Sequence, residues 1–160
     1  MKIKNAFALL ELLLAIGILA VIMGLSFPSW SHWLEKNRVD NAVVELMRML
    51  KASRQMAIEM NDSITVCPSK DNRTCEDFWE GPYVIVKKRN EVLISQNIGR
   101  ISLQWRSNLK RNKKLIFEAS GKTAGQQGHF LIQAHSSRSH AKNPYAKKIV
   151  VLMGGVIYSQ

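Results

Sequence analysis

The feature that most constrains this chain is an apolar run from Leu12 to Phe27, preceded by a single carboxylate, Glu11. As a helix, residues 7–27 would span about 30 Å, the thickness of a membrane's hydrocarbon core. An ionised side chain in such a segment costs about 3 kcal/mol on insertion scales, so Glu11 needs a cationic partner. A cut between Ala6 and Phe7 would create an α-amine one helical turn from Glu11, or near the Glu11 of a neighbouring copy. We therefore predict a transmembrane helix over about residues 7–27 with a neutralised charge near its start.

The residues around this site resemble the N-terminus of type IV prepilins. A short basic leader, residues 1–6, ends in Ala6, and it is followed by Phe7, Ala8, the apolar pair Leu9-Leu10 and Glu11. The resemblance implies cleavage by a prepilin peptidase between Ala6 and Phe7, N-methylation of Phe7, and a role for Glu11 in setting the axial register between subunits. Pro28 matches the proline that bends or loosens the pilin helix near the membrane exit. Ala6 departs from the family, in which Gly is usual at this position.

Two other interpretations explain less of the N-terminal sequence. A secretory signal has a shorter apolar region and a small-x-small cleavage site, which the residues after Phe27 do not offer. A plain single-span anchor fits the length of the apolar run, but it gives no role to Glu11.

Two cysteines, Cys67 and Cys75, flank a short polar loop. An anchor with a basic N-terminus directs the rest of the chain outward, into an oxidising space where this pair would form a disulfide. Metal binding is the alternative, but two Cys without converging His or acidic partners make a poor zinc site.

The pattern of apolar residues predicts a helix followed by strands. After Pro28, apolar and small residues recur at steps of three and four as far as Met60, which predicts one long helix over residues 7–60 whose apolar stripe packs on a sheet. Over residues 61–160 the period changes to two, which predicts a β-rich head. The expected strands are Ile64–Cys67, Tyr83–Lys87, Val92–Ser95, Ile98–Trp105, Lys114–Glu118, His129–Gln133, Ile149–Met153 and Val156–Tyr158. Gly154-Gly155 favours a hairpin between the last two strands, and Ala134–Ala146 reads as a polar loop.

The second part of the chain resembles the GspH/FimT domain. The residues that carry this resemblance are Ala42–Ile58, the run Ile64–Ser69 with its Cys-Pro-Ser turn, Cys75, Trp79, Gly81 and Tyr83. The resemblance implies an α+β pilin fold, in which the long N-terminal helix packs on an antiparallel, β-sandwich-like head.

The residues do not favour an enzyme. The four histidines lie at no recognisable spacing from a nucleophile, and Glu91 and Glu118 are the only acids after residue 80. Glycines surround Lys122 and Thr123, but not with the spacing of a phosphate-binding loop. We expect no catalytic residues, metal site or cofactor.

Positive charge is concentrated in the second half of the chain. Residues 81–160 contain 14 Lys or Arg and two Glu, a net charge of +12. Residues 1–80 contain 9 Lys or Arg and 10 Asp or Glu, a net charge of −1. The basic clusters fit a solvated face, attraction to anionic lipid, or contacts with a DNA backbone. The candidate DNA-binding residues are Lys110, Arg111, Lys113, Lys114, Arg138, Lys142, Lys147 and Lys148. FimT-type minor pilins that take up DNA resemble one another in a Gly-Arg-x-Arg turn, but the matching positions here read Gly-Gly-Val-Ile from Gly154 to Ile157, without either arginine.

These observations predict a minor pilin or pseudopilin. It would be a single-pass inner-membrane protein with a periplasmic head, and it would join a filament of other pilins or pseudopilins through its N-terminal helix. Its expected structural role is to help initiate filament assembly. The sequence does not distinguish between a type IV pilus and a type II secretion pseudopilus. The alternative is a minor pilin that binds DNA for uptake in natural transformation.

Overall fold

The structure is a computed structural model that describes residues 4–79, 81–99, 101–109, 113–134 and 145–160. One helix, α1 (Lys4–Glu59), is followed by the strands. The side chains of α1 are described for residues 9–24 and from residue 33 onward. The chain divides into two compact units, Met1–Glu35 and Lys36–Gln160.

In the first unit, α1 carries apolar side chains on all sides from Leu9 to Gly24, apart from Glu11. Between Leu9 and Met23 the large apolar side chains are each 55–67% exposed. Glu11 is also exposed, and it is the only charged residue from Leu9 to Gly24. Within the described residues, no helix has a stretch long and apolar enough to cross a membrane.

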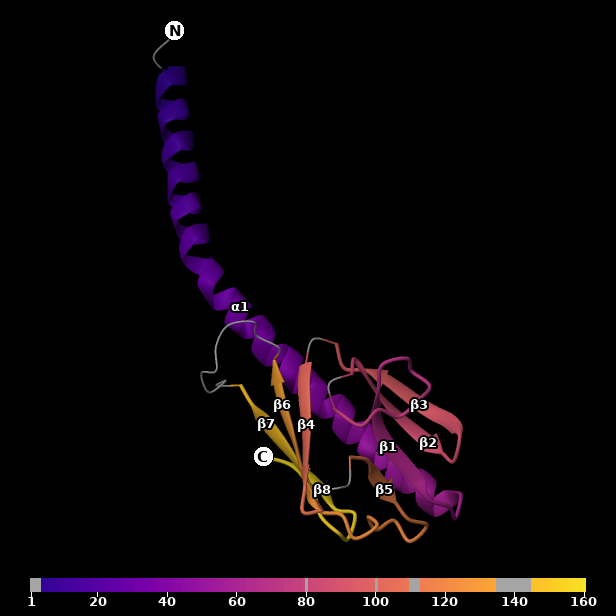
Figure 1. Ribbon diagram of the computed structural model, residues 1–160. Helices are drawn as coiled ribbons and strands as arrows, with labels where there is room; N and C mark the ends of the chain where they lie inside the picture. The colour runs from indigo at the N-terminus through magenta and orange to yellow at the C-terminus, as the bar shows by residue number, and fades with distance from the viewer. Residues whose placement is uncertain (1–3, 80, 100, 110–112, 135–144) are drawn as a thin grey trace. The chain divides into compact units, whose positions relative to one another are not determined.

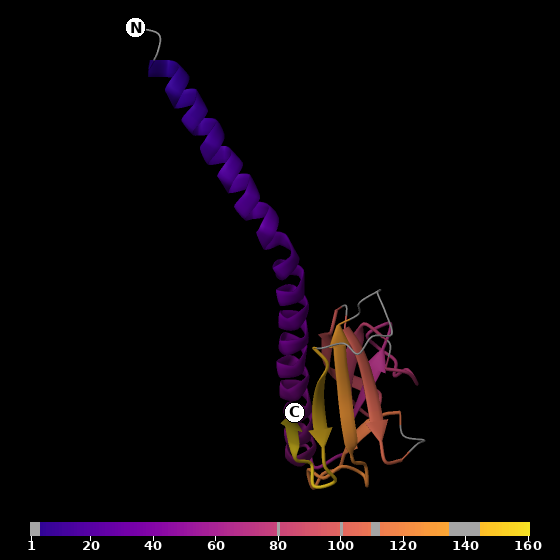
Figure 2. The same cartoon turned by 90° about the vertical axis from the view of Figure 1, so that its left-hand side faces the viewer.

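The second unit contains two antiparallel sheets beside the C-terminal half of α1. Among the described residues, one sheet has the order β3-β2-β1-β5 and the other the order β4-β6-β7-β8. Figures 1 and 2 show both sets of strands alongside this half of α1. The strands are β1 (Ile64–Ser69), β2 (Tyr83–Lys88), β3 (Glu91–Asn97), β4 (Ile101–Ser107), β5 (Leu115–Phe117), β6 (Gly128–Ala134), β7 (Lys147–Val151) and β8 (Ile157–Ser159).

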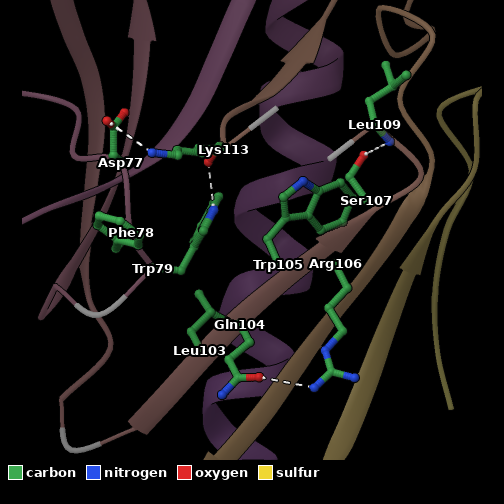
Figure 3. Close-up of a pocket in the computed structure, with 10 residues that line it drawn as sticks. All are labelled: Asp77, Phe78, Trp79, Leu103, Gln104, Trp105, Arg106, Ser107, Leu109 and Lys113. Carbon is green, nitrogen blue, oxygen red and sulfur yellow. Dashed lines mark hydrogen bonds and ion pairs between the residues drawn. The ribbon is translucent and has the colours of Figure 1, made fainter. Parts of the chain in front are cut away.

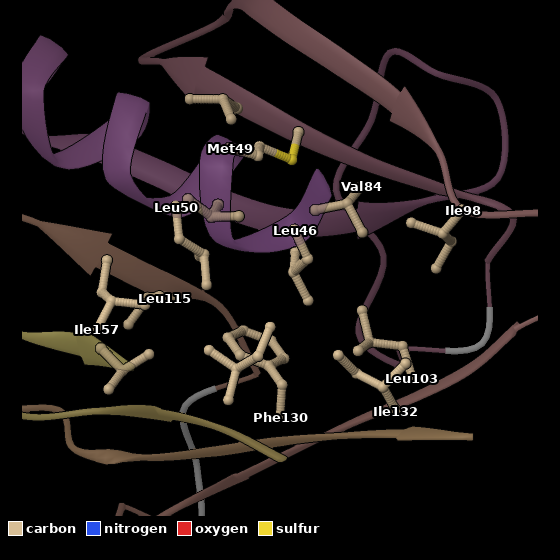
Figure 4. Packing of buried hydrophobic residues seen from close by; sticks show 14 of the residues in the cluster. Leu46, Met49, Leu50, Val84, Ile98, Leu103, Leu115, Phe130, Ile132 and Ile157 are labelled. Carbon is tan, nitrogen blue, oxygen red and sulfur yellow. The ribbon is translucent and has the colours of Figure 1, made fainter. Parts of the chain in front are cut away.

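One cluster of buried side chains joins α1 to both sheets. Leu46 and Leu50 of the helix lie among strand residues such as Leu115 and Phe130 (Figure 4). Full burial of a side chain such as Leu50 stabilises the fold by about 1.5–3 kcal/mol relative to exposure. The α1 residues in the cluster recur at helical spacing: Val39, Ala42, Val43, Leu46, Met49, Leu50 and Ala57. The α+β class and the packing of the helix stripe on sheets are therefore confirmed.

Every strand differs from its predicted bounds by one or more residues at an end, and two strands begin at least two residues from the predicted start. β4 begins at Ile101 instead of Ile98, because Gly99 has a positive φ of 63° that interrupts the extended backbone. β7 covers Lys147–Val151 instead of Ile149–Met153, since Leu152 belongs to the turn and accepts a hydrogen bond from the Gly155 N–H. The predicted hairpin around Gly154-Gly155 is confirmed as the β7–β8 pair.

Candidate functional site

The residues of the predicted processing and assembly site lie in α1. The helix begins at Lys4 and is continuous through Pro28, so Ala6 and Phe7 fall within its first turns. The side chains of Ala6, Phe7 and Pro28 lie outside the described residues. Glu11 is exposed among apolar neighbours.

Cys67 and Cys75 form a disulfide that closes the loop after β1. Asp71 organises this loop, because its carboxylate accepts hydrogen bonds from the backbone N–H groups of Thr74 and Arg73 at 2.8 and 2.9 Å. These bonds stabilise the ionised carboxylate and lower the pKa of Asp71 well below its usual value. The loop is thus fixed both covalently and by a charged cap.

The predicted DNA-binding residues do not form one free basic surface within the described part of the chain. The Nζ atom of Lys113 lies 3.2 Å from a carboxylate oxygen of Asp77, and that of Lys147 lies 2.6 Å from a carboxylate oxygen of Asp40. Lys114 is half-buried and Lys148 is exposed. The other four candidates lie outside the described residues: Lys110, Arg111, Arg138 and Lys142.

The cations around the β2–β3 turn are also near carboxylates. Lys88 and Arg89 lie 3.7 and 3.6 Å from Asp62, which follows the end of α1. The Ser63 N–H lowers the pKa of the Asp62 carboxyl, and the charges of Arg89 and Lys88 lower it further. Asp62 therefore stays ionised and partly neutralises this cluster.

A different set of side chains forms a cationic face on the sheet of β4, β6, β7 and β8. These four strands contain no Asp or Glu. One row of paired residues crosses the outer face of this sheet. It runs from Arg106 in β4 through His129 in β6 and Val150 in β7 to Tyr158 in β8. Lys148 projects from the same face, two residues from Val150. We call Arg106, His129 and Lys148 the outer cationic face.

The pKa of His129 depends on the charges of this face. Its pKa is lowered first by desolvation and then by the positive charges of Lys148 and Arg106. Neither Arg106 nor its pairing with His129 was predicted from the sequence. The alternation of side chains along β4 and β6 indicates which residues share a face of each strand. Pairing Arg106 with His129 also requires the register between the two strands.

An aromatic cleft lies next to the edge of the same sheet (Figure 3). It has a volume of about 520 Å³ and is lined by the segment Asp77–Trp79, by β4 from Leu103 onward, and by Lys113. Trp79 and Trp105 stand on two sides of it, and both rings contact the buried ring of Phe130, at centroid distances of 4.9 and 4.5 Å. The indole N–H of Trp79 donates to the Lys113 carbonyl, whereas that of Trp105 is buried without a partner among the described residues.

The turn before β8 has no room for arginine at the two arginine positions of the Gly-Arg-x-Arg pattern. Gly155 has a φ of 75°, and a Cβ built there would lie 2.0 Å from the carbonyl oxygen of Gly121. Ile157, at the second arginine position, is buried in the core. An arginine at either position would be incompatible with this packing.

Comparison with known proteins identifies the family. Residues 42–155 match the family described as "Type II transport protein GspH". The fold is similar to that of the type IV minor pilin FimU of Pseudomonas aeruginosa in two crystal forms. The first has a TM-score of 0.59 and 18% identity, covering 80% of this chain and 92% of that one. The second has a TM-score of 0.56 and 17% identity, covering 76% and 91%.

No match was found among curated proteins. The family match spans the last third of α1 and the strands from β1 to β7. The chain therefore belongs to the GspH family, and it has the fold of a type IV minor pilin.

Proposed function

We propose that this chain is a minor pilin or pseudopilin that helps to initiate filament assembly in a type IV pilus or a type II secretion pseudopilus. The observation that carries the proposal is the combination of a GspH-family head with an exposed apolar helix segment whose one charge is Glu11. Such a segment is stabilised when apolar surroundings cover it, and the helices of neighbouring subunits supply them.

The pathway that we propose begins at the inner membrane. A prepilin peptidase cleaves between Ala6 and Phe7, Phe7 is methylated, and residues 7–27 hold the protein until assembly. The head then faces the periplasm, where the Cys67–Cys75 disulfide is stable. In the filament, Glu11 pairs with the N-terminal amine of a neighbouring subunit.

The role of Glu11 is tested by replacing it with Gln, which removes the charge and keeps the shape. Glu11→Gln should leave the amount of protein in the membrane fraction unchanged, because it removes an unfavourable charge from an apolar segment. It should reduce the amount in sheared filaments several-fold, because the amine of the neighbour loses its partner. Glu91→Gln, at an exposed position in β3, is the matched control and should behave as the wild type.

Equal recovery of Glu11→Gln and wild type in filaments would refute the charge-pairing role. A loss of the variant from the membrane fraction itself would instead assign Glu11 to insertion or stability.

DNA binding during uptake is the second candidate function. Two observations favour it: the net charge of +12 over residues 81–160, and the outer cationic face, whose strands carry no carboxylate. The carboxylate contacts of Lys113 and Lys147 argue against the basic residues that the sequence analysis names as candidates.

A mobility-shift titration of the full chain in detergent with duplex DNA tests this candidate. Binding through phosphate contacts should weaken steeply as salt rises. Replacing Lys110, Arg111, Lys113 and Lys114 together by Gln should lower affinity if those residues carry binding, whereas Arg106→Gln with Lys148→Gln should do so if the outer cationic face carries it. No shift at low salt would exclude the DNA-binding role.

A further inference from the structure

The open edge of β4 adjoins both the aromatic cleft and the outer cationic face. Within the described strands, β4 pairs with β6 on one side only, because the sheet order begins at β4. About half of the backbone N–H and C=O groups of an edge strand point away from its neighbour and remain available to another strand. From Leu103 to Ser107, β4 also forms one wall of the cleft.

The cleft provides apolar surface beside this edge. Phe78 is 68% exposed, which is unusual for a large aromatic side chain, and Leu109 at the other end of the cleft is 42% exposed. Burying such side chains against an incoming apolar residue is favourable.

The charges beside the edge select the chemistry of the partner. Arg106 is exposed on β4, and its contact within the described residues is a long one to Gln104, at 3.5 Å. The Lys113 charge at the cleft is already balanced by Asp77. Because β4, β6, β7 and β8 carry no carboxylate, an acidic partner at the β4 edge meets attraction from Arg106 without repulsion from these strands.

We propose that β4 binds an extended acidic peptide segment of another protein as an additional strand. The segment pairs with the open edge of β4, inserts an apolar side chain between Phe78 and Trp105, and directs a carboxylate to Arg106. This is recognition by strand addition, in which backbone hydrogen bonds give affinity and the alternating side chains give specificity. The inference concerns the head alone, so it is independent of the role proposed for Glu11.

The test uses the full chain in detergent and a synthetic peptide as long as β4, in which Val and Glu alternate around a central Phe. Binding is followed by tryptophan fluorescence and by amide hydrogen exchange. The peptide should quench or shift the fluorescence saturably and should slow exchange specifically in β4, because the new strand covers that edge. Two comparison peptides replace Glu by Lys or place Pro at the centre, and both should bind at least tenfold more weakly.

Variants locate the binding surface. Arg106→Gln should weaken binding about tenfold, because a charge-assisted contact is lost. Trp105→Phe should weaken it about threefold, because the smaller ring leaves less apolar surface for the inserted side chain. Lys148→Gln is the matched control: it lies on the same face, two strands away from the edge at about 10 Å, so it should change the affinity by less than twofold.

Hydrogen exchange on the wild-type chain shows whether the peptide covers β4, so this measurement tests the proposal even if a variant folds poorly. Absence of binding, equal binding of the proline peptide, or protection elsewhere than in β4 would overturn the proposal. Equal effects of Arg106→Gln and Lys148→Gln, together with competition by duplex DNA, would assign the face to nucleic acid and also overturn it.

Discussion

At the scale of single residues, the side chain of Gln126 forms hydrogen bonds with the backbone at β5, as a neighbouring strand would. Its side chain is buried, and its carbonyl oxygen accepts from the Ile116 N–H at 2.9 Å while its amide donates to the Lys114 carbonyl at 3.0 Å. The side chain thus satisfies two backbone groups next to β5, on the edge that β1 does not cover.

Gln126→Ala should lower the free energy of unfolding by about 2 kcal/mol or more, because both backbone groups lose their partner in a buried place. Gln127→Ala is the control, since the neighbouring side chain is exposed and should contribute within about 0.5 kcal/mol. Urea titration followed by circular dichroism measures both. If the two variants unfold at the same urea concentration, the side chain of Gln126 is not part of the sheet.

His129 reports the charge of the outer cationic face through its protonation. Its folded-state pKa lies below the ordinary 6.5, so the unfolded chain binds more protons between the two values. The free energy of unfolding should therefore decrease as pH falls from 6.5 through the folded pKa, and the shift has no effect on stability at higher pH.

Lys148→Gln should raise the pKa of His129 toward 6.5 without restoring it fully, because desolvation is the larger cause and remains. Lys122→Gln removes a charge elsewhere and should leave the titration unchanged. The ring resonances of His129, followed by NMR between about pH 5 and 8, give the value directly. An unaltered pKa in Lys148→Gln would show that the two residues are not neighbours on one face.

At the scale of elements, the β7–β8 hairpin depends on one of two adjacent glycines. Gly155 needs its positive φ and approaches Gly121 closely, whereas a Cβ on Gly154 meets nothing within 4 Å. Arg54 holds the same Gly121 carbonyl through a 3.0 Å hydrogen bond from its Nε, so the turn is fixed against α1.

Gly155→Ala should destabilise the fold by more than about 1–2 kcal/mol, the cost of a left-handed non-glycine residue, because a steric overlap adds to it. Gly154→Ala should cost much less. Thermal unfolding of the two variants measures the difference, and equal melting temperatures would contradict the geometry of the turn.

The local patterns of the sequence were sufficient to predict the elements, but not the contacts between them. Alternation from Ile64 onward predicted strands in the right order, and the helical stripe on α1 predicted the buried face. The sequence pattern could not show that Lys147 reaches Asp40, because that ion pair joins β7 to α1 across most of the chain. Nor could it place Arg106 beside His129 and the cleft, since this requires the pairing of β4 with β6.

At the scale of the whole molecule, the unit Lys36–Gln160 contains a complete core. The buried apolar cluster among the described residues runs from Val39 to Ile157, all within this unit. A fragment that begins at Lys36 should therefore fold without residues 1–35, keep the Cys67–Cys75 disulfide and unfold cooperatively. Thermal unfolding by circular dichroism tests this, and a broad, non-cooperative transition would show that the N-terminal unit is needed for folding.

The central claim is that the chain is processed and enters a filament as a pilin-type subunit. The most direct measurement is the mass of its N-terminal peptide, obtained from sheared filaments of the native host. The account predicts a peptide that begins at N-methylated Phe7, with residues 1–6 removed. A peptide that still begins at Met1 in a host with an active prepilin peptidase, or the absence of the protein from filaments, would contradict it.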